Sequence, residues 1–155
     1  MEVSLKGMQW KLFLLGLFRI PIIGFVRPKL ILIDENKVCV SIGLIRRTRN
    51  HLNSMYFGAL AVGADIAAGI HVFYFSEKHN KKVSFAFKGM NVQFLKRAET
   101  NVFFECVEGQ KIENAFIKSI DSGDRINEQV DVIAYNLIGE QVAIFKMTVS
   151  LKVIR

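Results

Sequence analysis

Residues 49–76, RNHLNSMYFGALAVGADIAAGIHVFYFS, decide the fold of this chain because they combine length, apolarity and small side chains. Asp65 is the one acidic residue in the stretch, and the nearest acids on either side are Glu35 and Glu77. Small residues recur at the i, i+3, i+4, i+7 spacing of one helix face. That face consists of Gly58, Ala61, Val62, Asp65, Ala68, Gly69 and Val72. The spacing predicts a central helix that a sheet wraps around, with Asp65 as the residue best suited to chemistry.

The ends of this helix and its glycines carry further expectations. A glycine inside a helix costs about 0.5–1 kcal/mol relative to alanine, so several glycines indicate close packing or a ligand. They are Gly58, Gly63 and Gly69. Asn53 or Ser54 is expected to cap the first turn, since a short side-chain oxygen accepts a hydrogen bond from a free N–H group. The stretch is longer than an ordinary helix, so we expect fraying near Tyr74.

The composition indicates a folded domain with an anionic partner. The chain has 155 residues, of which 51% are hydrophobic, and is expected to fold as a single domain over residues 1–155. The net charge of +7 favours a nucleic acid, an acidic membrane surface or a phosphate-bearing small molecule. We expect no nucleic acid, because no arginine-rich tract is interleaved with aromatic residues.

The two cysteines, Cys39 and Cys106, lie in apolar, strand-like runs. We expect buried, reduced thiols, because nothing in their spacing resembles a disulfide framework or a zinc site. No metal site is expected. Reduced thiols indicate a cytoplasmic protein.

Residues 4–20, SLKGMQWKLFLLGLFRI, are predicted to form an amphipathic N-terminal helix that breaks at Pro21. The apolar run is too short to span a bilayer, which needs roughly 20 apolar residues. We favour a helix that packs on its own domain or on a partner subunit. The alternative is a peripheral helix at a membrane surface. Its cations would be Lys6, Lys11, Arg19 and Arg27.

The rest of the chain has the alternation that is typical of antiparallel strands. Strands are predicted over residues 29–33, 38–45, 83–96, 101–108, 128–137 and 141–154. The third has a change of phase at Lys88 and Gly89, which indicates a bulge. Residues 110–119 are ambiguous between a strand and a short irregular helix. One long helix followed by consecutive hairpins predicts an α+β domain whose antiparallel sheet packs one face on that helix.

Several motifs lie in the same order as in a known family. Asn50 precedes the central helix, residues 55–58 (MYFG) begin it, and Asp65 follows seven positions after Gly58. Residues 90–98, MNVQFLKRA, are similar to a strand pattern Asn-Ile-x-Phe-Leu-x-Pro-Ala. With these motifs, residues 20–154 resemble the hotdog-fold thioesterases, and in particular a little-characterised branch of the PaaI-like acyl-CoA thioesterases.

This resemblance implies the hotdog fold, a curved antiparallel sheet wrapped around one long central helix, and an acyl-CoA thioester as substrate. Coenzyme A would be part of that substrate, with no separate cofactor. The site would lie at the interface of a homodimer, which can pair again into a homotetramer, and Asn50 and Asp65 would come from opposite subunits. Candidate partners of the CoA phosphates are Arg46, Arg47, Arg49, Lys96 and Arg97.

The resemblance also suggests a role for each residue of the site. Asp65 would activate a water molecule or attack the thioester carbonyl itself. Asn50 would orient the water or the acyl carbonyl. The free N–H groups at the start of the helix, near Tyr56, Phe57 and Gly58, would hold the oxyanion with help from the positive end of the helix.

The chain departs from the family pattern at positions that matter for turnover. Tyr56 replaces the family's histidine, Phe57 its first glycine and Arg97 a proline. Apolar Phe87 lies near the place of a serine or threonine. The alternative to an enzyme is therefore a non-catalytic module that binds acyl-CoA or a fatty acyl group. His71 is expected to be structural, because it lies off the helix face of Asp65.

Overall fold

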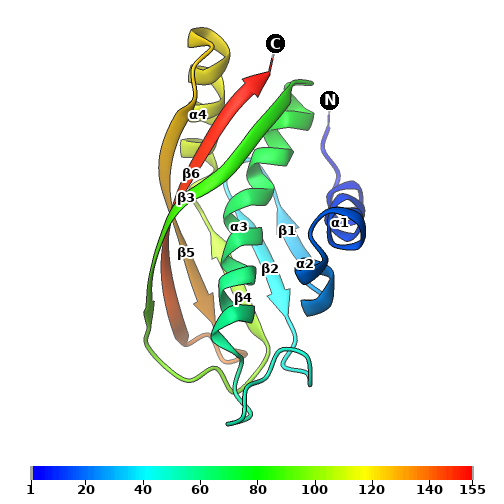
Figure 1. Ribbon diagram of the computed structural model, residues 1–155, viewed down its shortest axis with the longest axis vertical. Helices are drawn as coiled ribbons and strands as arrows, with labels where there is room; N and C mark the ends of the chain where they lie inside the picture. The colour runs from blue at the N-terminus through cyan, green and yellow to red at the C-terminus, as the bar shows by residue number, and fades with distance from the viewer. Residues whose placement is uncertain (1, 155) are drawn as a thin grey trace.

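A computed structural model describes residues 2–154 and shows a six-stranded antiparallel sheet curled around one long helix (Figure 1). The helix is α3, Phe57–Lys78, and the strand order in the sheet is β1-β2-β4-β5-β6-β3. The strands are β1 (Lys29–Ile33), β2 (Val38–Ile42), β3 (Lys82–Phe94), β4 (Val102–Cys106), β5 (Ile126–Tyr135) and β6 (Gln141–Ile154). The predicted antiparallel sheet around a central helix is confirmed.

β3 forms one edge of this sheet. It pairs with β6 along its length, and the register shifts between Phe87 and Gly89, which confirms the predicted bulge. The other edge of β3 has no partner strand among the described residues. Apolar side chains of β3 remain partly exposed, among them Val83, Phe85, Phe87 and Val92.

The inner side of α3 packs closely on the sheet because its residues are small. A Cβ atom at Gly63 would lie 2.3 Å from the ring of Phe104 on β4. On the side of α3 that faces β3, a Cβ atom at Gly69 would lie 3.3 Å from the ring of Phe85. By length and composition α3 could cross a membrane, but 67% of its apolar window is buried inside the domain. The glycines are therefore close-packing positions of a core helix, as predicted.

α3 begins later than predicted. Its N-cap is Tyr56, and no side chain caps its first turn. Asn53 has a left-handed backbone with φ 59°, and the buried Ser54 donates its hydroxyl to Oδ1 of Asn50 at 3.1 Å. The predicted cap at Asn53 or Ser54 is wrong, because both residues belong to a turn that Asn50 organises ahead of the helix.

α3 also ends later than predicted. Tyr74 is buried, and the helix continues to Lys78. The ammonium group of Lys78 lies 2.8 Å from a carboxylate oxygen of Glu113 and 2.7 Å from one of Glu35. Hydrogen bonds to Glu113 and Glu35 raise the pKa of Lys78 to about 12. The predicted fraying near Tyr74 is wrong, because these contacts hold the last turn.

The ambiguous segment 110–119 lies within a helix, α4 (Gly109–Ser122). α4 buries Ile112, Ala115 and Phe116 at helical spacing and packs on β5, β6 and α3. It ends at Gly123, whose left-handed backbone with φ 76° is a common helix terminator. Buried residues recur along this segment with the period of a helix, so the segment is a helix and not a strand.

Three short helical segments lie against β1 and α3 (Figure 1). They are α1 (Leu5–Leu14), the π-helical turn η1 (Leu15–Arg19) and α2 (Pro21–Val26). The hydroxyl of Ser4 caps α1 by accepting a hydrogen bond from the Gly7 N–H at 3.0 Å. Pro21 ends η1, but it also begins α2 at the position where proline needs no helix donor. The segment after Pro21 is thus a helix, and α1, η1 and α2 form a helical hairpin.

The predicted amphipathic character of residues 4–20 is wrong. Met8 and Leu12 of α1 are buried, whereas Trp10 and Phe13 of the same helix are exposed. Apolar side chains therefore occur all around the helix. This leaves a large apolar surface uncovered.

Cys39 and Cys106 are free and buried, as predicted. Burial raises the pKa of both thiols, that of Cys106 to about 11. Both are therefore protonated near neutral pH, and they fill space as small apolar groups.

Candidate functional site

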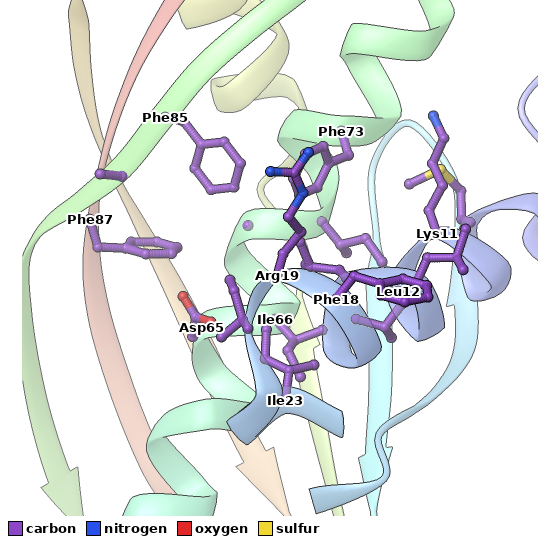
Figure 2. Close-up of a pocket in the computed structure, with 17 residues that line it drawn as sticks. Lys11, Leu12, Phe18, Arg19, Ile23, Asp65, Ile66, Phe73, Phe85 and Phe87 are labelled. Atoms are coloured by element: carbon purple, nitrogen blue, oxygen red, sulfur yellow. The ribbon is translucent and has the colours of Figure 1, made fainter. Parts of the chain in front are cut away.

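A cavity of about 640 Å³ lies between the N-terminal helices, α3 and β3 (Figure 2). Its apolar walls include Leu12 and Phe18 from the N-terminal helices, Ile66 and Phe73 from α3, and Phe85 and Phe87 from β3. A cavity of this size and polarity is of the kind that holds small organic ligands. The hairpin of α1, η1 and α2 is thus one wall of the site.

Asp65 is the one acidic residue in the cavity wall. α3 presents it there together with Gly69 and Phe73, because these positions are four residues apart on one helix face. Burial among apolar neighbours raises the pKa of the Asp65 carboxyl group to about 6. Within residues 2–154 no side chain or backbone group opposes this rise by bonding to the carboxylate. Asp65 is therefore a carboxylate of raised basicity.

Two cations line the same cavity. Lys11 is hydrogen-bonded to Glu77, which ties α1 to the end of α3. Arg19, the last residue of η1, has no ion-pair partner in the part of the chain that the structure describes. Figure 2 shows Arg19 and Asp65 reaching into the cavity from different walls. Sequence reasoning missed Arg19 as a cavity residue, because only the turn at Ile20 places η1 beside α3.

Asn50 organises the loop that leads into α3. Its Oδ1 accepts hydrogen bonds from the Leu52 N–H at 2.9 Å and from the Ser54 N–H at 3.2 Å, in addition to the Ser54 hydroxyl. Asp65 lies eight residues into the helix, about 12 Å along the axis at 1.5 Å per residue. The structure therefore does not bring Asn50 and Asp65 together within one chain.

The start of α3 exposes two aromatic rings. Tyr56 and Phe57 are both exposed, and their ring centroids are 4.7 Å apart. A Cβ atom at Gly58 would lie 2.5 Å from the Tyr56 ring, so glycine lets that ring fold over the first turn. The Tyr56 N–H donates to the Thr48 carbonyl at 2.7 Å, whereas the N–H groups of Phe57 and Gly58 belong to the first turn, which has no intrahelical acceptors.

The predicted phosphate-binding cations gather at the end of the domain where α3 begins. The Met55 N–H donates to the Ala98 carbonyl at 2.7 Å, so the loop before α3 and the segment after β3 are adjacent. The cations of these two segments are Arg46, Arg47, Arg49, Lys96 and Arg97, and all are exposed. Lys96 pairs with Glu140, and Arg97 lies 3.8 Å from Glu99. Arg46 and Arg49 have no such partner within residues 2–154.

His71 has a structural place on α3. Its ring is buried and packs on Phe75 with centroids 5.8 Å apart. Nε2 lies 2.9 Å from the Asp34 carbonyl oxygen, to which it donates a hydrogen bond. Burial lowers the pKa of this imidazole, so it is neutral near pH 7. His71 does not reach the cavity of Asp65.

A family model and several solved structures match this chain. A family model described as "Domain of unknown function (DUF4442)" matches residues 9–153. No curated protein matches the chain. A probable thioesterase of unknown function from Pseudomonas aeruginosa is 18% identical, with a TM-score of 0.80 over 99% of each chain.

Two further solved structures are named as thioesterases. The Haemophilus influenzae thioesterase is 9% identical, with a TM-score of 0.69 over 97% of this chain and 92% of that one. Zebra fish thioesterase superfamily member 2 is 11% identical, with a TM-score of 0.70 over 96% of this chain and 99% of that one. At such identities the likeness concerns the fold. The chain therefore has the fold of the hotdog thioesterases and, through the match over residues 9–153, belongs to the DUF4442 family.

Proposed function

We propose that this protein hydrolyses the thioester bond of an acyl-coenzyme A whose fatty or aromatic acyl group lies in the cavity beside Asp65. One observation carries the proposal: a carboxyl group with a pKa of about 6 lines an apolar cavity of about 640 Å³. The likeness to thioesterase structures supports the same chemistry.

The cavity suits an acyl chain because its walls are hydrocarbon. Each CH₂ group that leaves water for such walls contributes about 0.8 kcal/mol. Leu12, Ile66 and Phe73 supply aliphatic and aromatic surface along the cavity. Chain burial therefore provides binding energy that holds the thioester carbonyl near Asp65.

Asp65 acts as the general base in the simplest mechanism. The carboxylate takes a proton from water while the water oxygen attacks the carbonyl carbon, and the C–S bond then breaks. The proton passes to the departing thiolate, so the products are a carboxylic acid and free coenzyme A. A pKa of about 6 keeps Asp65 ionised at neutral pH and makes it a stronger base than an ordinary carboxylate. Direct attack by Asp65, with an anhydride intermediate, gives the same products.

The remaining site residues come from a second subunit in this proposal. The outer edge of β3 is free, and its N–H and C=O groups can pair with β3 of another copy to extend the sheet. The homodimer, or a tetramer of two such dimers, would bring the loop of Asn50 and the first turn of α3 near Asp65 of the partner. The N–H groups of Phe57 and Gly58 would then stabilise the oxyanion.

The phosphates of coenzyme A would lie at the end of the domain where α3 begins. Arg46 and Arg49 are the best candidates there, because Lys96 and Arg97 already pair with glutamates. A guanidinium group can bind a phosphate through two parallel hydrogen bonds.

The experiment is a hydrolysis panel with acyl-CoA esters of increasing chain length and with aromatic acyl groups, read by the release of free thiol. The unaltered protein should turn over at least one class, and Asp65→Asn should abolish that turnover. Asp121→Asn is the matched control, because Asp121 is an exposed acid at the end of α4. No thiol release from any ester, or full activity of the Asp65→Asn protein, would refute the proposal.

A second candidate function is binding without hydrolysis. The Tyr56 ring over Gly58 covers the turn where a thioesterase needs a free oxyanion site, and this observation favours a binding module. Calorimetry would then detect a stable complex with an acyl-CoA that releases no thiol. In that case Asp65→Asn should strengthen binding to the cavity, because it removes a desolvated charge.

A further inference from the structure

The outer side of the N-terminal helical hairpin is an exposed apolar surface that the cavity does not use. We call it the N-terminal face and define it by Trp10, Phe13, Leu17 and Phe25, whose side chains are 60%, 53%, 55% and 51% exposed. The rings of Trp10 and Phe13 stack with centroids 5.4 Å apart. Single exposed apolar residues are ordinary, but a contiguous group of large ones marks an interaction surface.

The N-terminal face rests on a tightly packed scaffold. A Cβ atom at Gly16 would lie 2.7 Å from the backbone nitrogen of Gly24, and one at Gly24 would lie 2.8 Å from the Gly16 carbonyl oxygen. The backbones of η1 and α2 therefore touch directly. In the neighbouring α1, Met8 and Leu12 are buried. The exposed rings are held in a fixed arrangement by the fold.

A groove of about 610 Å³ crosses this face. Phe13, Leu17 and Phe25 line it together with two arginines, Arg27 and Arg47. The Arg47 guanidinium lies 5.1 Å from the centre of the Phe25 ring. Neither arginine has an ion-pair partner in the described chain. Apolar walls beside free guanidinium groups match a molecule that has both a hydrocarbon chain and a phosphate.

The positive charge of the chain is concentrated in the part of the sequence that includes the hairpin. Residues 1–64 contain nine Lys and Arg and three Asp and Glu, so they carry +6 of the net +7. No acidic residue occurs between Glu2 and Asp34, the segment that forms the hairpin. The N-terminal face is thus apolar at its centre and is flanked by cations of the same segment, of which Lys11 pairs with Glu77.

We infer that the N-terminal face docks on an anionic lipid bilayer, with its rings among the acyl chains and with Arg27 and Arg47 at lipid phosphates. A second copy of the chain fits this face less well, because a two-fold contact would bring the arginines of both copies together without counter-charges. None of the four residues that define the N-terminal face lines the cavity that β3 borders, so pairing along the free edge of β3 would not use them.

Docking would place the substrate cavity at the lipid surface. Phe18 and Arg19 line that cavity and belong to the same hairpin as the face. A long acyl ester that partitions into a bilayer would then reach the cavity directly. The docking itself does not depend on thioester hydrolysis, so the Asp65→Asn protein should bind vesicles as the unaltered protein does.

The test is flotation with vesicles of phosphatidylcholine alone and of phosphatidylcholine mixed with phosphatidylglycerol. The protein should float with the mixed vesicles, and binding should weaken as salt is raised. Trp10 is the single tryptophan of the chain, so its emission should shift to the blue and be quenched by brominated acyl chains on docking. Failure to float with mixed vesicles, or an unquenched Trp10, would overturn the inference.

Two pairs of variants separate the apolar and the electrostatic parts. Trp10→Ser with Phe13→Ser should weaken vesicle binding at least about tenfold, whereas Ile138→Ser, at a 78% exposed site in the β5–β6 turn, should not. Arg27→Gln with Arg47→Gln should weaken binding to mixed vesicles on the order of tenfold, whereas Lys118→Gln on α4 should not. Circular dichroism checks that each variant is folded.

Size-exclusion chromatography distinguishes lipid docking from self-association. If lipid is the partner, the Trp10→Ser and Phe13→Ser protein keeps the oligomeric state of the unaltered protein. A smaller assembly together with unchanged flotation would show that a second copy covers the face, and the inference would be wrong.

Discussion

Replacing Asp65 by asparagine should stabilise the fold at neutral pH although it removes the proposed base. Desolvation in the cavity raises the pKa of Asp65 from the usual 3.8 to about 6. One pKa unit corresponds to about 1.4 kcal/mol. The ionised carboxylate therefore costs the folded state up to about 3 kcal/mol. Such a cost is expected of a residue that is kept for function.

The sign of the pH dependence follows from the direction of the pKa change. The folded protein holds the Asp65 proton more tightly than the unfolded chain does. The contribution of Asp65 to the free energy of unfolding is therefore most favourable below the usual pKa of 3.8. This contribution of Asp65 is lost as the pH rises, and its loss is complete above a pH of about 6. Asparagine carries no charge at any pH, so the variant does not lose this stability.

Urea unfolding at a series of pH values from about 4 to about 8 measures the effect. The free energy of unfolding of Asp65→Asn minus that of the unaltered protein should rise by up to about 3 kcal/mol across this range. Taking the difference cancels the titration of all other groups. Asp121→Asn should give a flat difference, and the protein concentration is held constant because an oligomer couples to stability.

A flat difference for Asp65→Asn would refute the reasoning, because it would show that folding does not perturb the carboxyl group. A difference that falls as the pH rises would show that the folded protein stabilises the ionised form, as for a structural aspartate. The same pKa predicts that kcat/KM for an acyl-CoA ester reaches half its maximum at a pH of about 6.

Three further predictions concern the helix and the cavity. Gly63→Ala should destabilise the fold by about 3 kcal/mol in urea unfolding, because its Cβ would lie 2.3 Å from the Phe104 ring. Ile66→Phe should shift the preferred acyl chain to shorter lengths in a kcat/KM series by filling the cavity, whereas Val62→Phe, outside the cavity wall, should not. Burial lowers the pKa of His71, so stability should fall as the pH drops below about 6.5, and His71→Gln should remove that part of the pH dependence.

Local pattern was enough to predict the strands and the central helix. Alternation along β3 even located its bulge beside Gly89. The glycine spacing of α3 predicted close packing, which the contact of Gly63 with Phe104 explains. These features depend on periodicity, and periodicity can be seen in the chain itself.

The helix ends and the N-terminal layer needed tertiary contacts. Ser54 is a good capping residue by type, but Asn50 binds its hydroxyl in the preceding turn. The last turn of α3 persists because Lys78 pairs with Glu113, a residue 35 positions away. Such long-range partners override local preference, and local sequence does not encode them.

By itself, the sequence determined the antiparallel sheet, the long small-residue helix and the isolation of Asp65, because these follow from the order and spacing of residue types. Only the tertiary structure decided that the hairpin of α1, η1 and α2 closes a cavity over Asp65 and that Arg19 lines this cavity. It also placed Asn50 in a loop before α3, too far from Asp65 to share the site within one chain. The physical reason is that burial, and with it the raised pKa of Asp65, depends on which surfaces meet in space.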